Sequence, residues 1–176
     1  GDVAENESET PATNTTEQPL INVTQEEEDT AGVTPDSKFL WGLERAIERV
    51  DLALTFGKSA KARKGLAHAR ERLAEVKMMI SERRFADAAA AEVVHDQELQ
   101  DVQDNVDSIE NSNATTELED VEEVEKELNQ HKWQVEKFGN LTLKIKGQLS
   151  ATEQAKVSQI VSAFEDSTSK VDVKIQ

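Results

Sequence analysis

Apolar side chains recur at helical spacing through the middle of the chain, with polar residues between them. The clearest run steps by four, three, four, three and four residues, through Ala62, Leu66, Ala69, Leu73, Val76 and Ile80. Such a stripe lies on one side of a helix and is stable only when another element buries it. Basic residues fall outside this stripe, at Lys61, Arg63, Lys64, Arg70 and Arg72. The run predicts a helix from about Ser59 to Glu82 that packs in a helical core.

Three more segments predict helices of the same core, over residues 37–56, from Phe85 or Ala86 to about Ile109, and from Thr116 to Phe138. Their apolar faces are formed by Phe39, Leu40, Leu43, Ile47, Val50 and Leu54; by Leu99, Val102, Val106 and Ile109; and by Leu118, Val121, Val124, Leu128, Val135 and Phe138. We expect a four-helix antiparallel core, with the last two helices forming an antiparallel pair. Trp41 and Trp133 are predicted to anchor it, since aromatic rings fill gaps between helices.

After Gly139 the apolar pattern changes from helical spacing to alternation. Apolar residues occupy every second position at Leu141, Leu143 and Ile145, and again at Val171, Val173 and Ile175. Between the two runs, Ser150 and Glu153 have the spacing of a capping box, which opens a helix. A period of two is typical of strands, so this region predicts a parallel strand–helix–strand unit.

In the alternative interpretation the preceding helix continues through Lys146. We disfavour it because Gly139 and Asn140 are residue types that commonly end helices. The fold class predicted is therefore mainly α, with an α+β character overall because of the C-terminal unit.

Residues 1–34 are rich in Glu, Thr, Asn, Ser and Pro and contain few large apolar groups. Such a composition buries too little apolar surface to offset the entropy of ordering, which predicts a disordered acidic tail. Leu20, Ile21 and Val23 interrupt it as a short docking or strand segment. The predicted organisation is tail (1–34), helical core (35–139) and strand–helix–strand unit (140–176).

Charge and composition exclude several classes of partner. The 36 acidic and 20 basic residues give a formal net charge of −16, which repels nucleic-acid phosphates and anionic membranes. No apolar run reaches the roughly 20 residues of a membrane-spanning helix, so we expect no direct membrane insertion. Cysteine is absent, so disulfides and thiolate metal sites are excluded.

Asn-x-Ser/Thr sequons occur at several positions in the chain, among them Asn14, Asn22, Asn113 and Asn140. These four fall in segments predicted to be tail or loop, where N-glycosylation acceptors are found. They make the protein a glycoprotein candidate and favour an extracytoplasmic location, either secreted or at the cell surface.

Residues Pro35 to Val50 read Pro-Asp-Ser-Lys-Phe-Leu-Trp-Gly-Leu-Glu-Arg-Ala-Ile-Glu-Arg-Val, and the segment Ala62 to Glu75 is rich in Ala, Arg, Leu and Glu. This combination resembles an uncharacterised helical domain of archaeal secreted proteins and bacterial anti-sigma-factor-like proteins. The resemblance covers about residues 35–110. It implies an extracytoplasmic helical module and brings no known active site.

One constellation has the residue types of a metal site. Glu92 and His95 have the Glu-x-x-His spacing used in di-iron helical bundles. In a hairpin centred on Asn113, His131 would lie opposite His95, with Glu127 one turn before it. We favour the simpler interpretation, in which the histidines are partly buried and hydrogen-bonded to neighbouring glutamates. No cofactor is therefore predicted, and a divalent transition metal at these four residues is the alternative.

The sequence contains no Gly-x-Ser-x-Gly nucleophile motif and no Gly-rich phosphate loop, so we expect a non-catalytic module with a structural or protein-binding role. Self-association or a protein partner could use the edge of the predicted C-terminal strands. The alternatives are an extracytoplasmic holdase chaperone and a metal-binding envelope sensor. Leu149 to Gln154 is similar to a motif of periplasmic helical chaperones, although the capping box explains the same residues.

Overall fold

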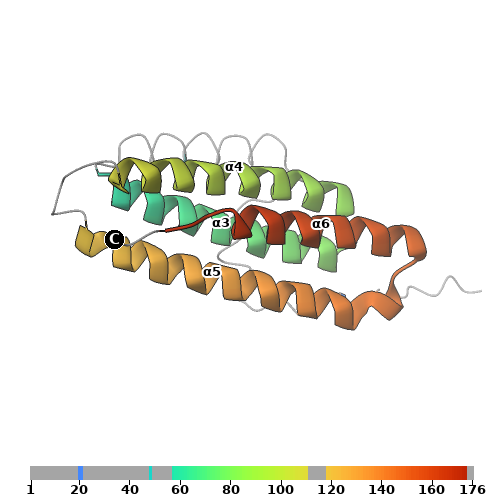
Figure 1. Cartoon of the computed structure of the whole chain (residues 1–176). Coiled ribbons are helices and arrows are strands. Elements are labelled where there is room, and N and C mark those ends of the chain that lie inside the picture. Colours follow the sequence, from blue (N-terminus) through green and yellow to red (C-terminus); the bar gives the residue numbers. More distant parts are fainter. Residues whose placement is uncertain (1–19, 22–47, 49–56, 111–117, 174–176) are drawn as a thin grey trace, which may run out of the picture.

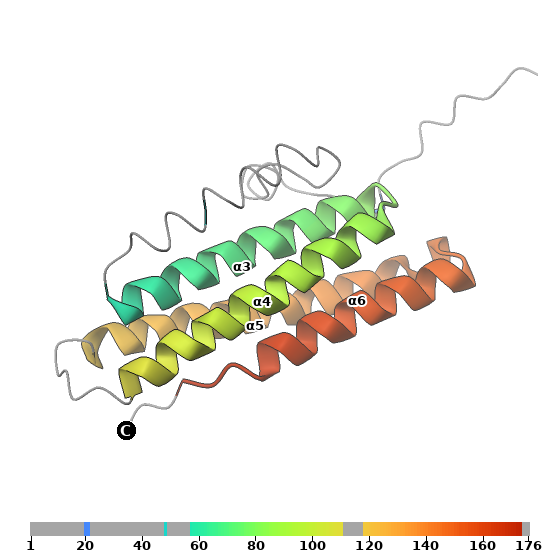
Figure 2. The ribbon, with the colours of Figure 1, turned by 90° about the horizontal axis from the view of Figure 1, so that it is seen from above.

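The computed structural model describes residues 20–21, 48, 57–110 and 118–173. Within them the chain forms four long helices: α3 (Lys58–Ser81), α4 (Phe85–Glu110), α5 (Leu118–Ile145) and α6 (Ala151–Ser169). A short 3₁₀ turn, η1 (Lys146–Gln148), joins α5 to α6. The helices lie side by side in an elongated bundle (Figure 1), and successive helices run in opposite directions (Figure 2). None of the described helices has the length and apolar character needed to cross a membrane.

The bundle is arranged so that each helix has two main neighbours. Helix α3 packs against α4 and α5, and α6 packs against the same two helices from the other side. The predicted antiparallel pair, α4 and α5, does run antiparallel, but the main packing partners of both are α3 and α6. The predicted helix over residues 37–56 lies outside the described residues except for Glu48, and α6 is the fourth helix of the bundle described here.

The predicted strand–helix–strand unit is wrong, because the described part of the chain contains no strand. Helix α5 continues to Ile145. This agrees with the alternative interpretation, in which the helix extends past Gly139. Residues 141–145 contain only three alternating apolar positions, and helical spacing fits them better. Thr142 and Ile145 are buried whereas Leu143 is 67% exposed.

Gly139 does not end α5 but marks the crossing of α5 with α6. A Cβ atom placed on Gly139 would lie 3.0 Å from Oε1 of Glu165 and 3.5 Å from Val161. The absence of a side chain therefore lets the two helices approach. Thr142 donates its hydroxyl hydrogen to the carbonyl of Gly139 at 2.7 Å, so this buried polar side chain finds its hydrogen-bond partner within its own helix.

The alternating residues 171–173 at the C-terminal end do lie in an extended segment, but this segment contacts helices instead of a strand. Val171 and Val173 are buried and Asp172 is exposed. The side-chain amide of Gln103 on α4 donates to the carbonyl of Asp172 at 3.2 Å, and its oxygen accepts from the Asp172 N–H at 2.8 Å. Lys132 on α5 donates to the carbonyl of Val171 at 3.1 Å. Side chains of two helices thus replace the strand partner, and the predicted docking mode through a strand edge loses its basis here.

Two residues of the predicted tail pack in the core. Leu20 and Ile21 are 7% and 2% exposed. Ser81, at the end of α3, accepts from the Leu20 N–H through its carbonyl and donates its hydroxyl hydrogen to the carbonyl of Ile21 at 2.8 Å. Leu20 and Ile21 therefore dock on the bundle, which agrees with the prediction of a docking segment and not with that of a strand.

Local signals explain where the well-predicted helices begin and end. The capping box at the start of α6 is present, with Ser150 and Glu153 satisfying each other's backbone N–H groups. Helix α3 ends in a turn where the N–H of Arg84 bonds to the carbonyl of Met79, with Arg83 at φ 60°. The Arg83 guanidinium bonds to Glu153 at 3.0 Å, which links this turn to the start of α6.

The apolar interior falls into two clusters stacked along the bundle. One contains Leu73, Val76, Met79, Ile80, Val135, Phe138, Ile160 and Phe164 among others. The second contains Ala62, Leu66, Leu99, Val102, Val106, Val124 and Leu128, and includes Val171 and Val173. In α3, α4 and α5 the change from one cluster to the other occurs next to a buried polar residue, and buried Ser167 of α6 lies between Phe164 of one cluster and Val171 of the other.

A glycine at the α3–α4 crossing provides a test of this packing. A Cβ on Gly65 would lie 2.6 Å from Cγ2 of Val102, whereas a Cβ on Gly147 in η1 would meet nothing within 4 Å. Gly65→Ala should therefore destabilise the protein by about 1–3 kcal/mol, despite alanine's better helix propensity. Gly147→Ala is the control and should change stability by less than about 0.5 kcal/mol. Urea unfolding of both variants measures this, and equal stability of the two would contradict the close approach of α3 and α4.

Candidate functional site

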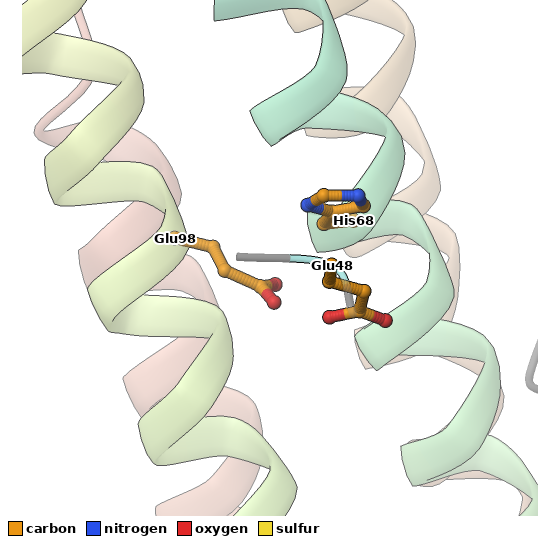
Figure 3. Close-up of side chains that lie close together, drawn as sticks. All are labelled: Glu48, His68 and Glu98. Atoms are coloured by element: carbon orange, nitrogen blue, oxygen red, sulfur yellow. The ribbon is translucent and has the colours of Figure 1, made fainter. Parts of the chain in front are cut away.

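Three side chains able to ligate a metal gather where α3 faces α4. Glu48, His68 and Glu98 each offer one ligand atom, and these atoms lie within 4.8 Å of one another (Figure 3). His68 comes from α3, Glu98 from α4 and Glu48 from the chain before α3. All three are intermediate in exposure, so the group lies near the surface rather than in the core.

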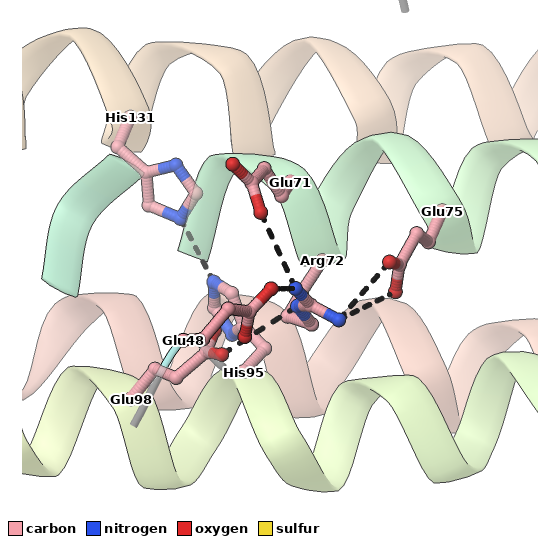
Figure 4. Close-up of polar contacts among 7 residues, drawn as sticks. All are labelled: Glu48, Glu71, Arg72, Glu75, His95, Glu98 and His131. Carbon is pink, nitrogen blue, oxygen red and sulfur yellow. Dashed lines mark hydrogen bonds and ion pairs between the residues drawn. The ribbon is translucent and has the colours of Figure 1, made fainter. Parts of the chain in front are cut away.

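The same carboxylates surround Arg72, the largest fully buried side chain described. Its guanidinium bonds to both carboxylate oxygens of Glu75, at 3.0 and 3.1 Å, and to Glu48. Glu71 lies 3.4 Å from Nη2, the nitrogen that also contacts Glu48, and Glu98 lies 3.5 Å from Nε (Figure 4). Burial alone would lower the pKa of Arg72, but the carboxylates, Glu75 first, raise it above its ordinary value. The arginine was placed outside the apolar stripe by its spacing, yet it is 0% exposed.

Beside Arg72, each of the other helices contributes one buried polar residue at the same level of the bundle. Nε2 of His95 on α4 lies 2.8 Å from Nε2 of His131 on α5. Nδ1 of His95 lies 3.2 Å from the hydroxyl oxygen of Ser167 on α6. We call Arg72, His95, His131 and Ser167 the polar layer; it separates the two apolar clusters.

The heavy-atom distances of the polar layer are compatible with a consistent assignment of the histidine tautomers, in which Ser167 donates to its own helix. The Ser167 hydroxyl donates to the carbonyl of Phe164 at 3.2 Å, so its oxygen accepts from Nδ1–H of His95. Nε2 of His95 then accepts from Nε2–H of His131. This arrangement leaves Nδ1 of His131 as an unprotonated acceptor, and that atom has no hydrogen-bond partner in the part of the chain described.

Both rings are held neutral. Burial, followed by the nearby His131 and Arg72, places the pKa of His95 well below its ordinary value. Burial also lowers the pKa of His131 to about 4, with smaller contributions from Arg70 and Lys77. The predicted proximity of His95 and His131 is therefore confirmed, and the contact is a direct hydrogen bond between neutral imidazoles.

The two glutamates predicted to join the histidines lie elsewhere. Glu127 forms an ion pair with Arg63 on the α3–α5 side, at 3.0 Å. Glu92 lines a hollow of about 430 Å³ between α4 and α6, where burial and Asp96 raise its pKa. A metal at Glu92, His95, Glu127 and His131 stays an untested prediction, and in this structure the histidines interact with each other and Ser167 instead of with these carboxylates.

Two other sequence predictions change in the structure. Trp133 was predicted to anchor the core but is 58% exposed, on the outer face of α5. The sequon at Asn140 was placed in a loop but lies within α5, where Asn140 is exposed and Thr142 is buried. Trp41 and the sequons at Asn14, Asn22 and Asn113 lie outside the described residues.

The fold and its buried layer define an antiparallel helical bundle with a charged and histidine-containing interior. Residues 32–131 match a domain family described as a domain of unknown function (DUF5667). Because this match spans more than half of the 176 residues, the chain belongs to that family. The predicted membership of an uncharacterised domain family is confirmed. No curated protein matches the chain, and no solved structure does.

Substitution of two arginines of α3 compares the contribution of buried ion pairs to stability with that of an exposed ion pair. Arg72→Met removes a cation that is 0% exposed and leaves its carboxylates without it, which should cost about 3–5 kcal/mol of unfolding free energy. Arg63→Met is the matched control; its guanidinium is 47% exposed beside Glu127, so the loss should be below about 1 kcal/mol. Chemical denaturation measures both, and similar losses would contradict the structural role of Arg72.

The neutral histidines predict that acid destabilises the fold. Below about pH 6.5 the unfolded chain protonates His131, whereas the folded protein does so only near pH 4, so stability is full above 6.5 and falls as the pH drops toward 4. The slope is about 1.4 kcal/mol per pH unit for each such group. Urea unfolding at about pH 7 and about pH 5 should show this decline, and His131→Gln should reduce it.

The control for this experiment is Ser167→Ala, which removes the hydrogen-bond partner of His95 without removing a titrating group. It should lower stability at both pH values while leaving the difference between them nearly unchanged. An equal decline in wild type and His131→Gln would contradict the assignment of a neutral buried His131.

Proposed function

We propose that the chain is a non-catalytic helical module that binds another protein, outside the cytoplasm, either secreted or at the cell surface. The observation that carries the binding role is Trp133, a large aromatic side chain exposed on the outer face of α5. Tryptophan is enriched among the residues that dominate binding energy at protein interfaces.

The interior supports a structural rather than a catalytic role for the polar residues. Arg72 and His95 are 0% exposed and His131 is 2% exposed. A substrate would have to separate helices to reach them. Their contacts with carboxylates, with each other and with Ser167 account for their presence in the core.

The surroundings of Trp133 favour a basic partner. Trp133 lines an open hollow of about 500 Å³ whose other walls are Glu122, Glu125, Lys126, Asn129 and Gln130. The ammonium of Lys137 lies 4.1 Å from the centre of the Trp133 ring, which shows that this ring face accepts a cation. An arginine or lysine of a partner can replace Lys137 there, and the net charge of −16 favours its approach.

The location rests on the sequence. The resemblance to archaeal secreted and bacterial anti-sigma-factor-like domains and the sequons outside the described helices support an extracytoplasmic setting. Holdase activity has less support, because Val93 lies on α4 whereas Trp133 and Leu143 lie on α5, about 15 Å apart along its axis. These exposed apolar side chains therefore form no single broad face.

Peptide binding provides the test. The probe is a set of arginine- and leucine-containing helical peptides, with peptides carrying glutamate for arginine as the charge control. The full chain should bind the basic set, and Trp133→Ala should weaken binding at least tenfold, or about 1.4 kcal/mol. Titration calorimetry measures the affinity. Leu143→Ala is the matched control, since this side chain is 67% exposed on the same helix, and it should bind as wild type does.

Three outcomes would contradict the proposal. They are the absence of binding to any basic peptide, equal binding of the acidic peptides, and unchanged affinity in Trp133→Ala. Strong binding of a hydrophobic dye by the folded wild-type chain would favour the holdase alternative instead.

A further inference from the structure

The group of Glu48, His68 and Glu98 is independent of the Trp133 surface and of the buried histidine pair. The three residues come from three segments of the chain, and their ligand atoms converge within 4.8 Å (Figure 3). Ligands bonded to one metal at about 2.0–2.2 Å lie roughly 3–4 Å apart, so side-chain movements of about 1 Å would close the group around an ion.

The local charge points to a cation. Arg72 lies within 4 Å of four carboxylates, those of Glu48, Glu71, Glu75 and Glu98. Among these five groups, the carboxylates outnumber the guanidinium. A divalent ion at Glu48 and Glu98 would therefore meet negative charge that Arg72 shares among several partners.

The carboxylates of Glu48 and Glu98 can bind a metal ion while they contact Arg72. Arg72 contacts Oε1 of Glu48 and Oε1 of Glu98. An ionised carboxylate has about four lone-pair sites, so it can accept from a guanidinium and bind a metal at once. His68 precedes Arg72 by one helical turn on α3. Its imidazole is therefore placed on the same side of the helix as the guanidinium.

We propose that Glu48, His68 and Glu98 form a binding site for a divalent transition metal, of the Zn²⁺ or Mn²⁺ class. Imidazole is a ligand for first-row transition metals, whereas Ca²⁺ and Mg²⁺ prefer oxygen ligands alone. Three protein ligands leave coordination positions for water, and the intermediate exposure of all three residues gives an ion access from solvent. The bound ion ties Glu48 to α3 and α4.

This site differs from the one predicted from Glu92, His95, Glu127 and His131. The sequence spacing could not reveal it, because its successive ligands are 20 and 30 residues apart in the chain. Arg72 is the link between the site and the polar layer, since it contacts two of the ligands and lowers the pKa of His95.

The test is metal titration of the full chain without an affinity tag, after treatment with a chelator. Calorimetry with ZnCl₂, with MnCl₂ and with CaCl₂ as the comparison should give one ion per chain for at least one of the two transition metals. His68→Ala and Glu98→Gln should each weaken binding at least tenfold. His131→Gln is the matched histidine control and should retain the wild-type affinity.

Two further readouts keep the test independent of folding. Circular dichroism in chelator identifies a variant that fails to fold, and His68→Gln then replaces His68→Ala. Cobalt(II) added to wild type should give ligand-field absorption that His68→Ala abolishes and His131→Gln keeps.

The proposal is overturned by any of four results. These are no binding of either metal, equal affinity in wild type and His68→Ala, loss of binding in His131→Gln with retention in His68→Ala, and tighter binding of Ca²⁺ than of Zn²⁺ and Mn²⁺. The second result would identify adventitious surface binding, and the third would move the metal to the buried histidines. None of them affects the peptide-binding test on Trp133.

Discussion

The buried guanidinium of Arg72 constrains the bundle more than any other group described. A cation removed from water costs several kcal/mol unless anions are fixed around it, and its carboxylate partners belong to α3, α4 and the segment containing Glu48. A planar guanidinium accepts these partners in only a few directions. Sliding α4 along α3 by one turn would carry Glu98 about 5 Å away, and the charge of Arg72 would lose a partner. The arginine therefore holds the axial register of α3 and α4, in which Gly65 meets Val102.

The rest of the polar layer extends this constraint across the bundle. His95 joins His131 and Ser167, so α4, α5 and α6 are connected at the level where the two apolar clusters meet. A shift of any helix would bring an unpaired imidazole or hydroxyl against Leu, Val or Phe side chains, at the cost of an unsatisfied buried polar group. Replacing such layers by apolar residues often raises stability, so their contribution here is to specify one packing. The unpartnered Nδ1 of His131 is a cost that remains in this arrangement.

Helical periodicity predicted α3 and α4 closely and identified the meeting of His95 with His131, because those signals are local or follow from an antiparallel arrangement. Three other features depend on tertiary contacts that spacing does not report. Gly139 looked like a helix end, yet α6 needs its missing side chain for a close crossing. Arg72 looked like an exposed cation, since nothing in its own helix reveals that Glu48 and Glu98 cover it. Val171 and Val173 alternate as in a strand, but Gln103 of α4 supplies the backbone partner.

The family match ends at His131, but the folding unit cannot end there. Within the matched residues, Leu73, Val76 and Ile80 of α3 belong to an apolar cluster completed by Val135, Phe138 and Phe164, which lie after the match. The ring of His95 packs in a tilted contact against Phe164, at 4.2 Å between centroids, and its Nδ1 is hydrogen-bonded with Ser167, both on α6. Without α6 these groups would be exposed or unpaired, at a cost comparable with the whole stability of a small domain. The chain after residue 131 is therefore part of the same cooperative core, and the polar layer, not the end of the family match, is the midpoint of that core.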